Sequence, residues 1–240
     1  MKTIGLIGGM SWESTVPYYR VINEAVKERL GGLHSAKIVL YSVDFHEIEH
    51  LQRSGNWTEA GRVLAQAAVA LQAAGAEFLV LCTNTMHKVA DAIEGVVAIP
   101  LLHIADATAE AIQCRNLATV GLLGTRFTME ENFYMDRLKE RHGINVIVPD
   151  TADREFVHRV IYDELCLGKV CDTSRTEYRR IMQRLVDRGA QGVILGCTEL
   201  SLLVGSGDVP APVFDTASIH AHSAVEWALQ DPAQTHLPDR

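Results

Sequence analysis

The sequence predicts an α/β protein built from two similar halves, and three observations lead to this prediction. Short apolar, β-branched segments alternate with longer helical segments along the 240 residues. An internal repeat brings similar segments in the same order in both halves of the chain. The composition is that of a globular protein, with 48% hydrophobic and 22% charged residues.

The alternation begins with an apolar strand at residues 3–7, and a helix is expected over residues 12–30. A second strand at 37–43 is followed by an Ala- and Leu-rich helix at 58–74. Further strands are expected at residues 78–81, 118–123, 145–148, 192–195 and 212–214. Because helices separate these strands, we expect mostly parallel sheets, flanked by helices and built from right-handed crossovers.

The internal repeat is clearest between AGAEFLVLCTNT at 74–85 and RGAQGVILGCTE at 188–199. The two segments align without gaps at an offset of 188 − 74 = 114 residues. This offset places Thr83 opposite Cys197. Equivalent strand ends in the two halves therefore carry side chains that can exchange a proton.

Two further segments repeat in the same order. IGLIGGM at 4–10 resembles VGLLGTR at 120–126, and IPLLHIADA at 99–107 resembles APVFDTASI at 211–219. We therefore expect two similar domains related by a pseudo-two-fold axis. The carboxyl ends of their strands would face across a cleft, which is where open α/β sheets bind ligands.

The repeat also suggests domain boundaries. We expect an N-terminal domain of residues 1–98, completed by a returning segment at 209–230, and a second domain of residues 99–208. Residues 231–240 are expected to form a flexible tail outside the functional fold.

Charge and composition argue against several classes of protein. Thirty acidic and 22 basic residues give a net charge of −8, which argues against a nucleic-acid partner. No apolar stretch approaches the roughly 20 residues that cross a bilayer, and no signal-peptide pattern is evident, so we expect a cytoplasmic protein without a membrane partner. The five cysteines are odd in number and scattered, unlike a disulfide framework.

Polar side chains gather at the expected strand ends. They are Ser11, Ser42, Asp44, Thr83, Asn84, Thr85 and His87 in the first half, and Thr125, Arg126, Cys197, Thr198 and Glu199 in the second. Hydroxyl, amide and backbone N–H groups with one thiol suit a small carboxylate or amino acid. A free cysteine is more often an inert apolar residue, but Cys197 follows Gly196 at a strand end, where a thiol can be activated.

Three motifs resemble those of a known family, the cofactor-independent aspartate/glutamate racemases. They are IGLIGGMSWEST near the N-terminus, LCTNTMH at 81–87 and GCTEL at 196–200. Within that family the chain is most similar to the enterobacterial branch of L-aspartate/glutamate-specific and broad-specificity racemases. The resemblance implies an isomerase with its active site between two similar domains. It also implies no metal or other cofactor, a small amino-acid substrate and a homodimer.

The implied chemistry removes the Cα proton from one face of the substrate and returns a proton to the other. We expect Cys197 to be the base toward the L-enantiomer and Thr83, which stands where the family pattern has Cys, to support proton return. A thiolate suits this role because its pKa, about 8.5 when unperturbed, can be lowered by nearby donors. Cys82 is expected to point to the opposite side of its strand.

The expected substrate-binding residues are Met10, Gln52, Arg53, Asn84, Thr85, Thr125, Thr128, Thr198 and Glu199. Backbone and side-chain donors of the two motifs would stabilise charge that develops at the α-carboxylate. Gln52 and Arg53 are candidates for the distal substituent. Many aspartate racemases have a Lys where this chain aligns Cys166, so no strict requirement for a second carboxylate is expected. Trp12 is expected to wall the pocket, and His87 either orients Thr83 or caps a helix.

Two alternatives remain open. A one-cysteine relative, such as a decarboxylase or a cis–trans isomerase of small dicarboxylates, would transform its substrate without inverting an enantiomer. A racemase-derived amino-acid-binding protein would bind its ligand without exchanging the α-proton. The sequence does not rank aspartate, glutamate and a broader range of amino acids as substrates.

Overall fold

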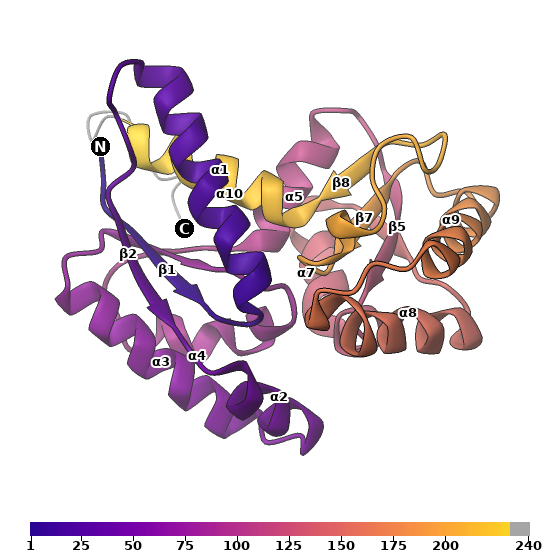
Figure 1. Ribbon diagram of the computed structural model, residues 1–240, viewed down its shortest axis with the longest axis horizontal. Coiled ribbons are helices and arrows are strands. Elements are labelled where there is room, and N and C mark those ends of the chain that lie inside the picture. The colour runs from indigo at the N-terminus through magenta and orange to yellow at the C-terminus, as the bar shows by residue number, and fades with distance from the viewer. Residues whose placement is uncertain (231–240) are drawn as a thin grey trace.

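The computed structural model describes residues 1–230 and divides them into two lobes, each built on a four-stranded parallel sheet (Figure 1). The first sheet has the order β2-β1-β3-β4 and contains β1 (Ile4–Gly8), β2 (Ile38–Ser42), β3 (Phe78–Leu81) and β4 (Leu101–Leu102). The second has the order β6-β5-β7-β8 and contains β5 (Thr119–Gly124), β6 (Asn145–Ile147), β7 (Val193–Gly196) and β8 (Val213–Asp215). The repeated strand order confirms the predicted α/β class and the two similar halves.

Helices cover both faces of each sheet. In the first half these are α1 (Trp12–Leu30), α2 (Phe45–Arg53), α3 (Trp57–Ala73), the 3₁₀ turn η1 (Thr85–Val89), α4 (Ala90–Glu94) and α5 (Ile104–Gln113). In the second half they are α6 (Arg126–Glu130), α7 (Asn132–His142), α8 (Thr151–Asp163), η2 (Leu165–Leu167), α9 (Asp172–Asp187), η3 (Leu200–Leu202) and α10 (Thr216–Leu229). Among residues 1–230, none of these helices is long and apolar enough to cross a membrane.

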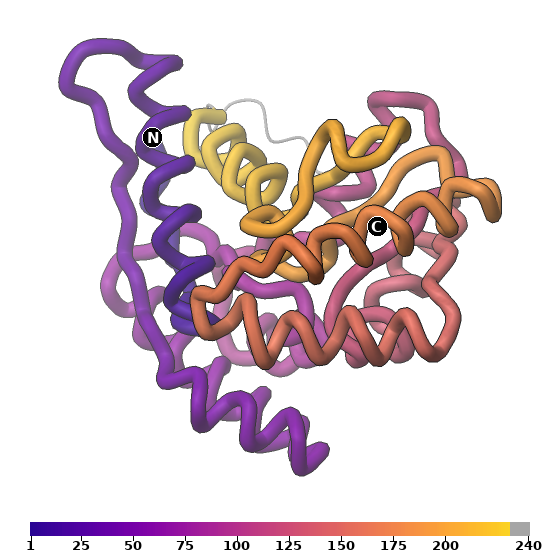
Figure 2. The backbone as a smooth tube through the Cα atoms, turned by 45° about the vertical axis from the view of Figure 1, so that its right-hand side comes forward, coloured from indigo at the N-terminus to yellow at the C-terminus, as the bar shows by residue number. Residues whose placement is uncertain are grey.

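The two lobes exchange their last helices. Helix α5 follows β4 of the first sheet, but its Ile104, Ala109 and Ile112 are buried in the core of the second lobe. Helix α10 follows β8 of the second sheet, and its Ala221 and Ala224 pack in the core of the first lobe. Figures 1 and 2 show α10 beside α1. Because each core contains a helix from the other half, burial of apolar surface couples the two lobes.

The crossing points are equivalent in the two halves. The His103 side chain caps α5 by accepting the Ala105 N–H at 3.2 Å, and Asp215 caps α10 by accepting the Ala217 N–H at 3.1 Å. These two N-cap residues are paired by the sequence repeat. The chain leaves the first sheet after Leu102 and the second after Asp215, a few residues beyond the predicted boundaries at 98 and 208. The predicted tail, 231–240, lies outside the described residues.

Tight turns after the central strands bring the motifs to the cleft. Gly9, directly after β1, has a φ of +93°, and a Cβ at this position would collide with the carbonyl oxygen of Val43. Glycine therefore allows the turn to pass against the end of β2. The turn delivers Met10 and Ser11, both buried, to the space between the lobes.

Candidate active site

The two motif residues paired by the repeat lie at the same place in their sheets. Thr83 comes two residues after the end of β3, and Cys197 directly follows β7. Each is 7% exposed, and both line one small cavity. Since β3 and β7 are central strands of the two sheets, the cavity lies between the carboxyl ends of the lobes.

Most of the residues expected from the sequence line this cavity. They are Met10, Gln52, Thr83, Asn84, Thr85, Thr125, Cys197, Thr198 and Glu199. Thr128 lies just behind the lining, with its hydroxyl 3.3 Å from that of Thr85. Arg53 does not line the cavity, and its side chain is 71% exposed. Trp12 was expected to wall the pocket, which is wrong: it is 63% exposed and does not line the cavity.

Five lining residues were absent from the set of expected binding residues. They are Phe45, Ile161, Tyr162, Cys166 and Gly196. Cys166 was mentioned above because many aspartate racemases have a lysine at that position, and Gly196 directly precedes Cys197. Ile161 and Tyr162 come from α8, and Phe45 begins α2. These helices contribute side chains to the cavity because they pack between the lobes. Such packing produces no local pattern in the sequence.

Hydrogen bonds between the lobes hold the two motif loops in place. Glu199 accepts a hydrogen bond from the Ser11 hydroxyl at 2.6 Å. The Thr85 hydroxyl lies 2.9 Å from that of Thr125. The repeat pairs Thr85 with Glu199. In both lobes, the residue at this position of the motif therefore forms a hydrogen bond with the turn that follows the first strand of the other lobe. Because all four side chains are buried, losing one partner would leave a polar group without a hydrogen bond.

The Cys197 thiol is protonated and hydrogen-bonded to a carboxylate. Its Sγ donates to Glu199 Oε2 at 3.0 Å, and the Thr198 hydroxyl donates to the same oxygen at 2.9 Å. Burial and then the Glu199 charge raise the pKa of Cys197 well above its usual value. A backbone hydrogen bond from Glu199 acts in the opposite direction, but the net shift of the Cys197 pKa is upward. The contact of Sγ with Glu199 Oε2 gives the thiol proton a direct acceptor.

The Thr83 backbone is held by a buried histidine. His87 Nε2 accepts the Ile104 N–H at 3.2 Å, so Nδ1 carries the ring proton and donates it to the Thr83 carbonyl oxygen at 2.7 Å. Both roles considered for His87 have a contact that corresponds to them: Nδ1 holds the Thr83 carbonyl, and Nε2 caps α5 at Ile104. The Thr83 loop is thus linked to the first residue of α5 at the crossing between the lobes.

His87 belongs to a cluster of three buried histidines, with His103 and His220. Burial lowers the pKa of His103 to about 2 and of His220 to about 4, and it holds that of His87 well below its usual range. Arg137 adds to the effect on His103. All three rings are therefore neutral in the folded protein near neutral pH.

The cluster predicts loss of stability in weak acid. Unfolded histidines bind protons below a pKa of about 6.5, whereas the folded ones do not. The free energy of unfolding should be steady above pH 6.5 and fall from there toward pH 4.5, by up to about 1.4 kcal/mol per pH unit for each histidine. Urea denaturation across this range measures the slope. In His220→Gln the slope should be smaller by about one proton, whereas His34→Gln, at an exposed histidine, should leave it unchanged. A wild-type stability that is constant from pH 7 to 5 contradicts the prediction.

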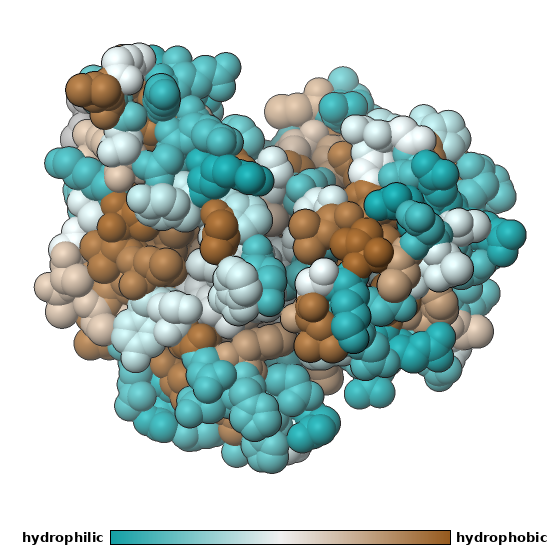
Figure 3. Space-filling model, viewed as in Figure 1, coloured by the Kyte–Doolittle hydropathy of each residue, from teal (hydrophilic) through white to brown (hydrophobic). Residues whose placement is uncertain are grey.

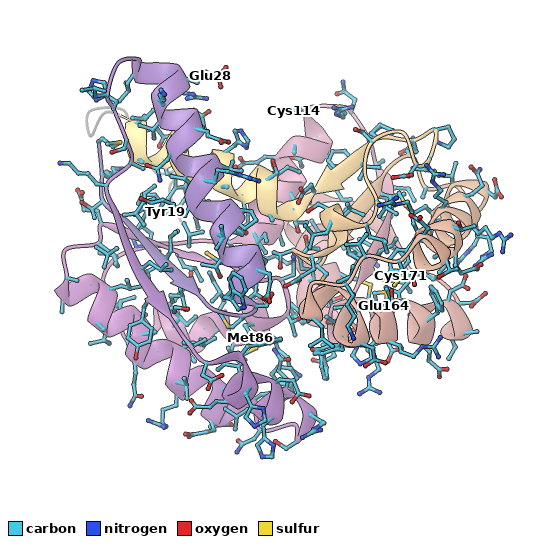
Figure 4. All side chains as sticks on the ribbon, viewed as in Figure 1. Tyr19, Glu28, Met86, Cys114, Glu164 and Cys171 are labelled. Carbon is cyan, nitrogen blue, oxygen red and sulfur yellow. The ribbon has the colours of Figure 1, made fainter. Side chains whose placement is uncertain are left out.

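A polar contact between the lobes closes one side of the cavity. The Tyr162 hydroxyl of α8 donates to Gln52 Oε1 of α2 at 3.1 Å. Gln52 Nε2 lies 3.0 Å from Sδ of Met86, which Figure 4 labels just above α2. Gln52 is 4% exposed, so its side-chain amide makes this contact between the lobes in the protein interior.

Fold and site together define a class: two-lobed α/β proteins with a buried thiol and hydroxyl at equivalent strand ends facing one small cavity. A sequence profile of the Asp/Glu/hydantoin racemase family matches residues 7–224. The chain belongs to this family. The predicted family and the predicted class of enzyme, an isomerase, are both confirmed at this level.

Individual relatives agree over nearly the full length. The crystal structure of a candidate Asp/Glu racemase from Yersinia pestis is 61% identical, with a TM-score of 0.90, covering 96% of this chain and 100% of that one. An aspartate racemase homologue from Pyrococcus horikoshii is 37% identical, with a TM-score of 0.83 and the same coverage. The broad-specificity amino-acid racemase RacX of Bacillus subtilis is 22% identical, over 94% of this chain and 98% of its own.

Proposed function

We propose that this protein is a cofactor-independent amino-acid racemase in which Cys197 takes the α-proton of the L-enantiomer and Thr83 serves the opposite face of Cα. The observation that supports it is the common cavity: Thr83 and Cys197 line it from equivalent strand ends of opposite lobes. A substrate between the lobes then has one protic side chain on each side. Aspartate, glutamate or a broader range of amino acids are the proposed substrates.

Proton transfer on the cysteine side begins with Glu199. The thiol gives its proton to Glu199 Oε2, 3.0 Å away, and the resulting thiolate removes the Cα proton. The carbanion that remains carries charge onto the α-carboxylate, where the hydroxyl and amide groups of Asn84, Thr85 and Thr198 act as donors. Glu199 afterwards releases its proton to water.

Proton return on the other face uses Thr83. An alcohol is a weak acid and base at neutral pH, so its hydroxyl relays a proton from water to Cα, and water restores the hydroxyl. The groups on the two faces of Cα therefore differ in strength as acids and bases. The cysteine side exchanges protons quickly, and the threonine side limits inversion.

Exchange and inversion separate in D₂O. Each amino acid is incubated in both configurations, loss of the α-proton signal is followed by NMR, and inversion is followed by chiral chromatography. We expect the L-substrate to lose its α-proton faster than it inverts. Absence of exchange for every amino acid overturns the racemase proposal. Equal rates of exchange and inversion from both enantiomers overturn the unequal roles of Cys197 and Thr83.

Two expectations from the sequence concern the location and the assembly of the protein. A cytoplasmic location and a homodimer stay predictions from the sequence and from the family resemblance.

A further inference from the structure

A second hollow lies outside the catalytic cavity and shares a wall with it. It has a volume of about 280 Å³ and is lined by Glu49, Gln52, Arg53, Arg126, Phe127, His158 and Tyr162. Gln52 and Tyr162 line both spaces. Figure 3 shows the surface notched at the lower edge between the lobes, where α2 and α8 of Figure 1 face each other. We call this space the outer hollow.

The wall between the two spaces is a hydrogen-bonded pair from opposite lobes. The Tyr162 hydroxyl donates to Gln52 Oε1, and the Tyr162 ring packs on His158 with 4.8 Å between ring centroids. No covalent or backbone link joins the pair across the cleft. If a ligand group takes the place of this one hydrogen bond, the catalytic cavity and the outer hollow become one continuous space.

The outer hollow carries more positive than negative charge. Among residues 1–230, two arginines, Arg53 and Arg126, line it together with one acidic residue, Glu49. Arg53 is 3.8 Å from Glu49, which offsets its charge. Arg126 lies over the Phe127 ring at 5.6 Å, and no carboxylate within residues 1–230 is within 4.0 Å of it.

His158 adds no charge of its own. Its Nδ1 accepts the backbone N–H of Arg126 at 3.2 Å, and burial followed by the Arg126 charge lowers the pKa of the ring. The positive region therefore depends chiefly on Arg126. In a chain of net charge −8, a positive cleft wall concentrates anions that the rest of the surface repels.

The catalytic cavity itself has the opposite character. Its lining, as the described part of the chain forms it, contains the Glu199 carboxylate and no Lys or Arg side chain. Arg126 directly follows Thr125, which lines that cavity, but Arg126 itself lines the outer hollow, which Gln52 and Tyr162 share with the cavity. In the repeat its counterpart is the apolar Met10. The cation thus stands at one end of the cleft, beyond the reacting centre.

We propose that the outer hollow is the binding site for a second, distal carboxylate of the substrate, with Arg126 as its principal cation and the Gln52–Tyr162 pair as the wall that the ligand parts. This rests on the proposed function for the α-carbon chemistry. Amino acids whose side chain ends in a neutral group gain little from the charge of Arg126.

The test compares L-glutamate with L-glutamine, which differ at the distal group alone. Arg126→Gln should raise KM for exchange of the glutamate α-proton about 10-fold or more, an effect that salt reduces, and should leave kcat and the glutamine values within about 2-fold. Arg126→Lys should restore most of the loss. Arg53→Gln should act more weakly, since Glu49 already offsets Arg53. The matched control, Arg180→Gln on α9, should change neither substrate. Equal effects of Arg126→Gln on both substrates, or none, overturn the proposal.

Binding of glutarate separates this inference from the proposed function. Glutarate has two carboxylates and no ammonium group, and calorimetry detects its binding without any reaction. Weaker binding to Arg126→Gln than to the wild type supports the outer hollow even in a chain that exchanges no α-proton. Equal binding to both overturns the outer hollow even in an active racemase.

Discussion

Replacing Glu199 with Gln is expected to slow exchange of the L-substrate α-proton by about 10²- to 10⁴-fold. Burial and the carboxylate raise the pKa of the Cys197 thiol, and in the proposed mechanism the thiolate forms when Glu199 takes the proton across their 3.0 Å contact. A glutamine amide cannot take up the thiol proton. The change keeps the size of the side chain, and its carbonyl oxygen can still accept from the Ser11 hydroxyl.

The measurement is the initial rate of α-proton loss in D₂O, followed by NMR over a range of pH. The Glu199→Gln rate should rise toward the wild-type rate as the pH increases, because the Cys197 thiol, whose pKa is raised, then loses its proton without an acceptor. Glu177→Gln on α9 is the matched control and should behave as the wild type. Thermal unfolding of each variant checks that the fold is intact. A folded Glu199→Gln protein with wild-type exchange would show that the thiol proton leaves by another route.

The repeat explains why so much of the site is predictable from the sequence. Because similar segments recur in the same order, the strand ends of one half can be matched to those of the other. This matching pairs Thr83 with Cys197 and Thr85 with Glu199. The same alignment pairs His103 with Asp215, which both cap a helix in the structure. Short apolar runs between helices were sufficient for the sheet class, because parallel strands require crossovers.

Contacts between lobes were beyond the reach of the sequence. Tyr162 and Ile161 reach the cavity from α8, whose rotation about its axis is set by packing against the second sheet. Periodicity shows which face of such a helix is buried, but not which of its residues lie over a neighbouring lobe. Arg53 and Arg126 illustrate the same limit: the sequence favoured Arg53, whereas the structure pairs it with Glu49.

The direction of the Cys197 pKa shift has a related cause. A strand end rich in hydroxyls and N–H groups suggests stabilisation of a thiolate. In the structure the thiol is 7% exposed and its nearest charged partner is an anion, so both solvation and charge favour the protonated form. The sequence shows that Glu199 is two residues from Cys197, but not that its carboxylate oxygen faces the thiol. This contact decides whether the pKa of Cys197 rises or falls.

Removing the hydroxyl of Thr83 is expected to separate exchange from inversion. Thr83→Val keeps the branched shape of the side chain and the contact of its carbonyl oxygen with His87, so the loop should hold its place. Cys197 and Glu199 are unchanged, and the L-substrate should still lose its α-proton at close to the wild-type rate. Inversion should fall by about 10²-fold or more, because no protic side chain remains on that face.

The complementary variant supplies a stronger acid and base at the same position. Thr83→Cys should bring the rates of exchange from the L- and D-enantiomers closer together, since each face then carries a thiol. Thr58→Val, at an exposed threonine of α3, is the control for the loss of a hydroxyl. Both rates come from the same D₂O incubation, by NMR and chiral chromatography. If Thr83→Val inverts its substrate as fast as the wild type, proton return does not pass through Thr83, and the two faces of the cleft are served by water or by Cys197 alone.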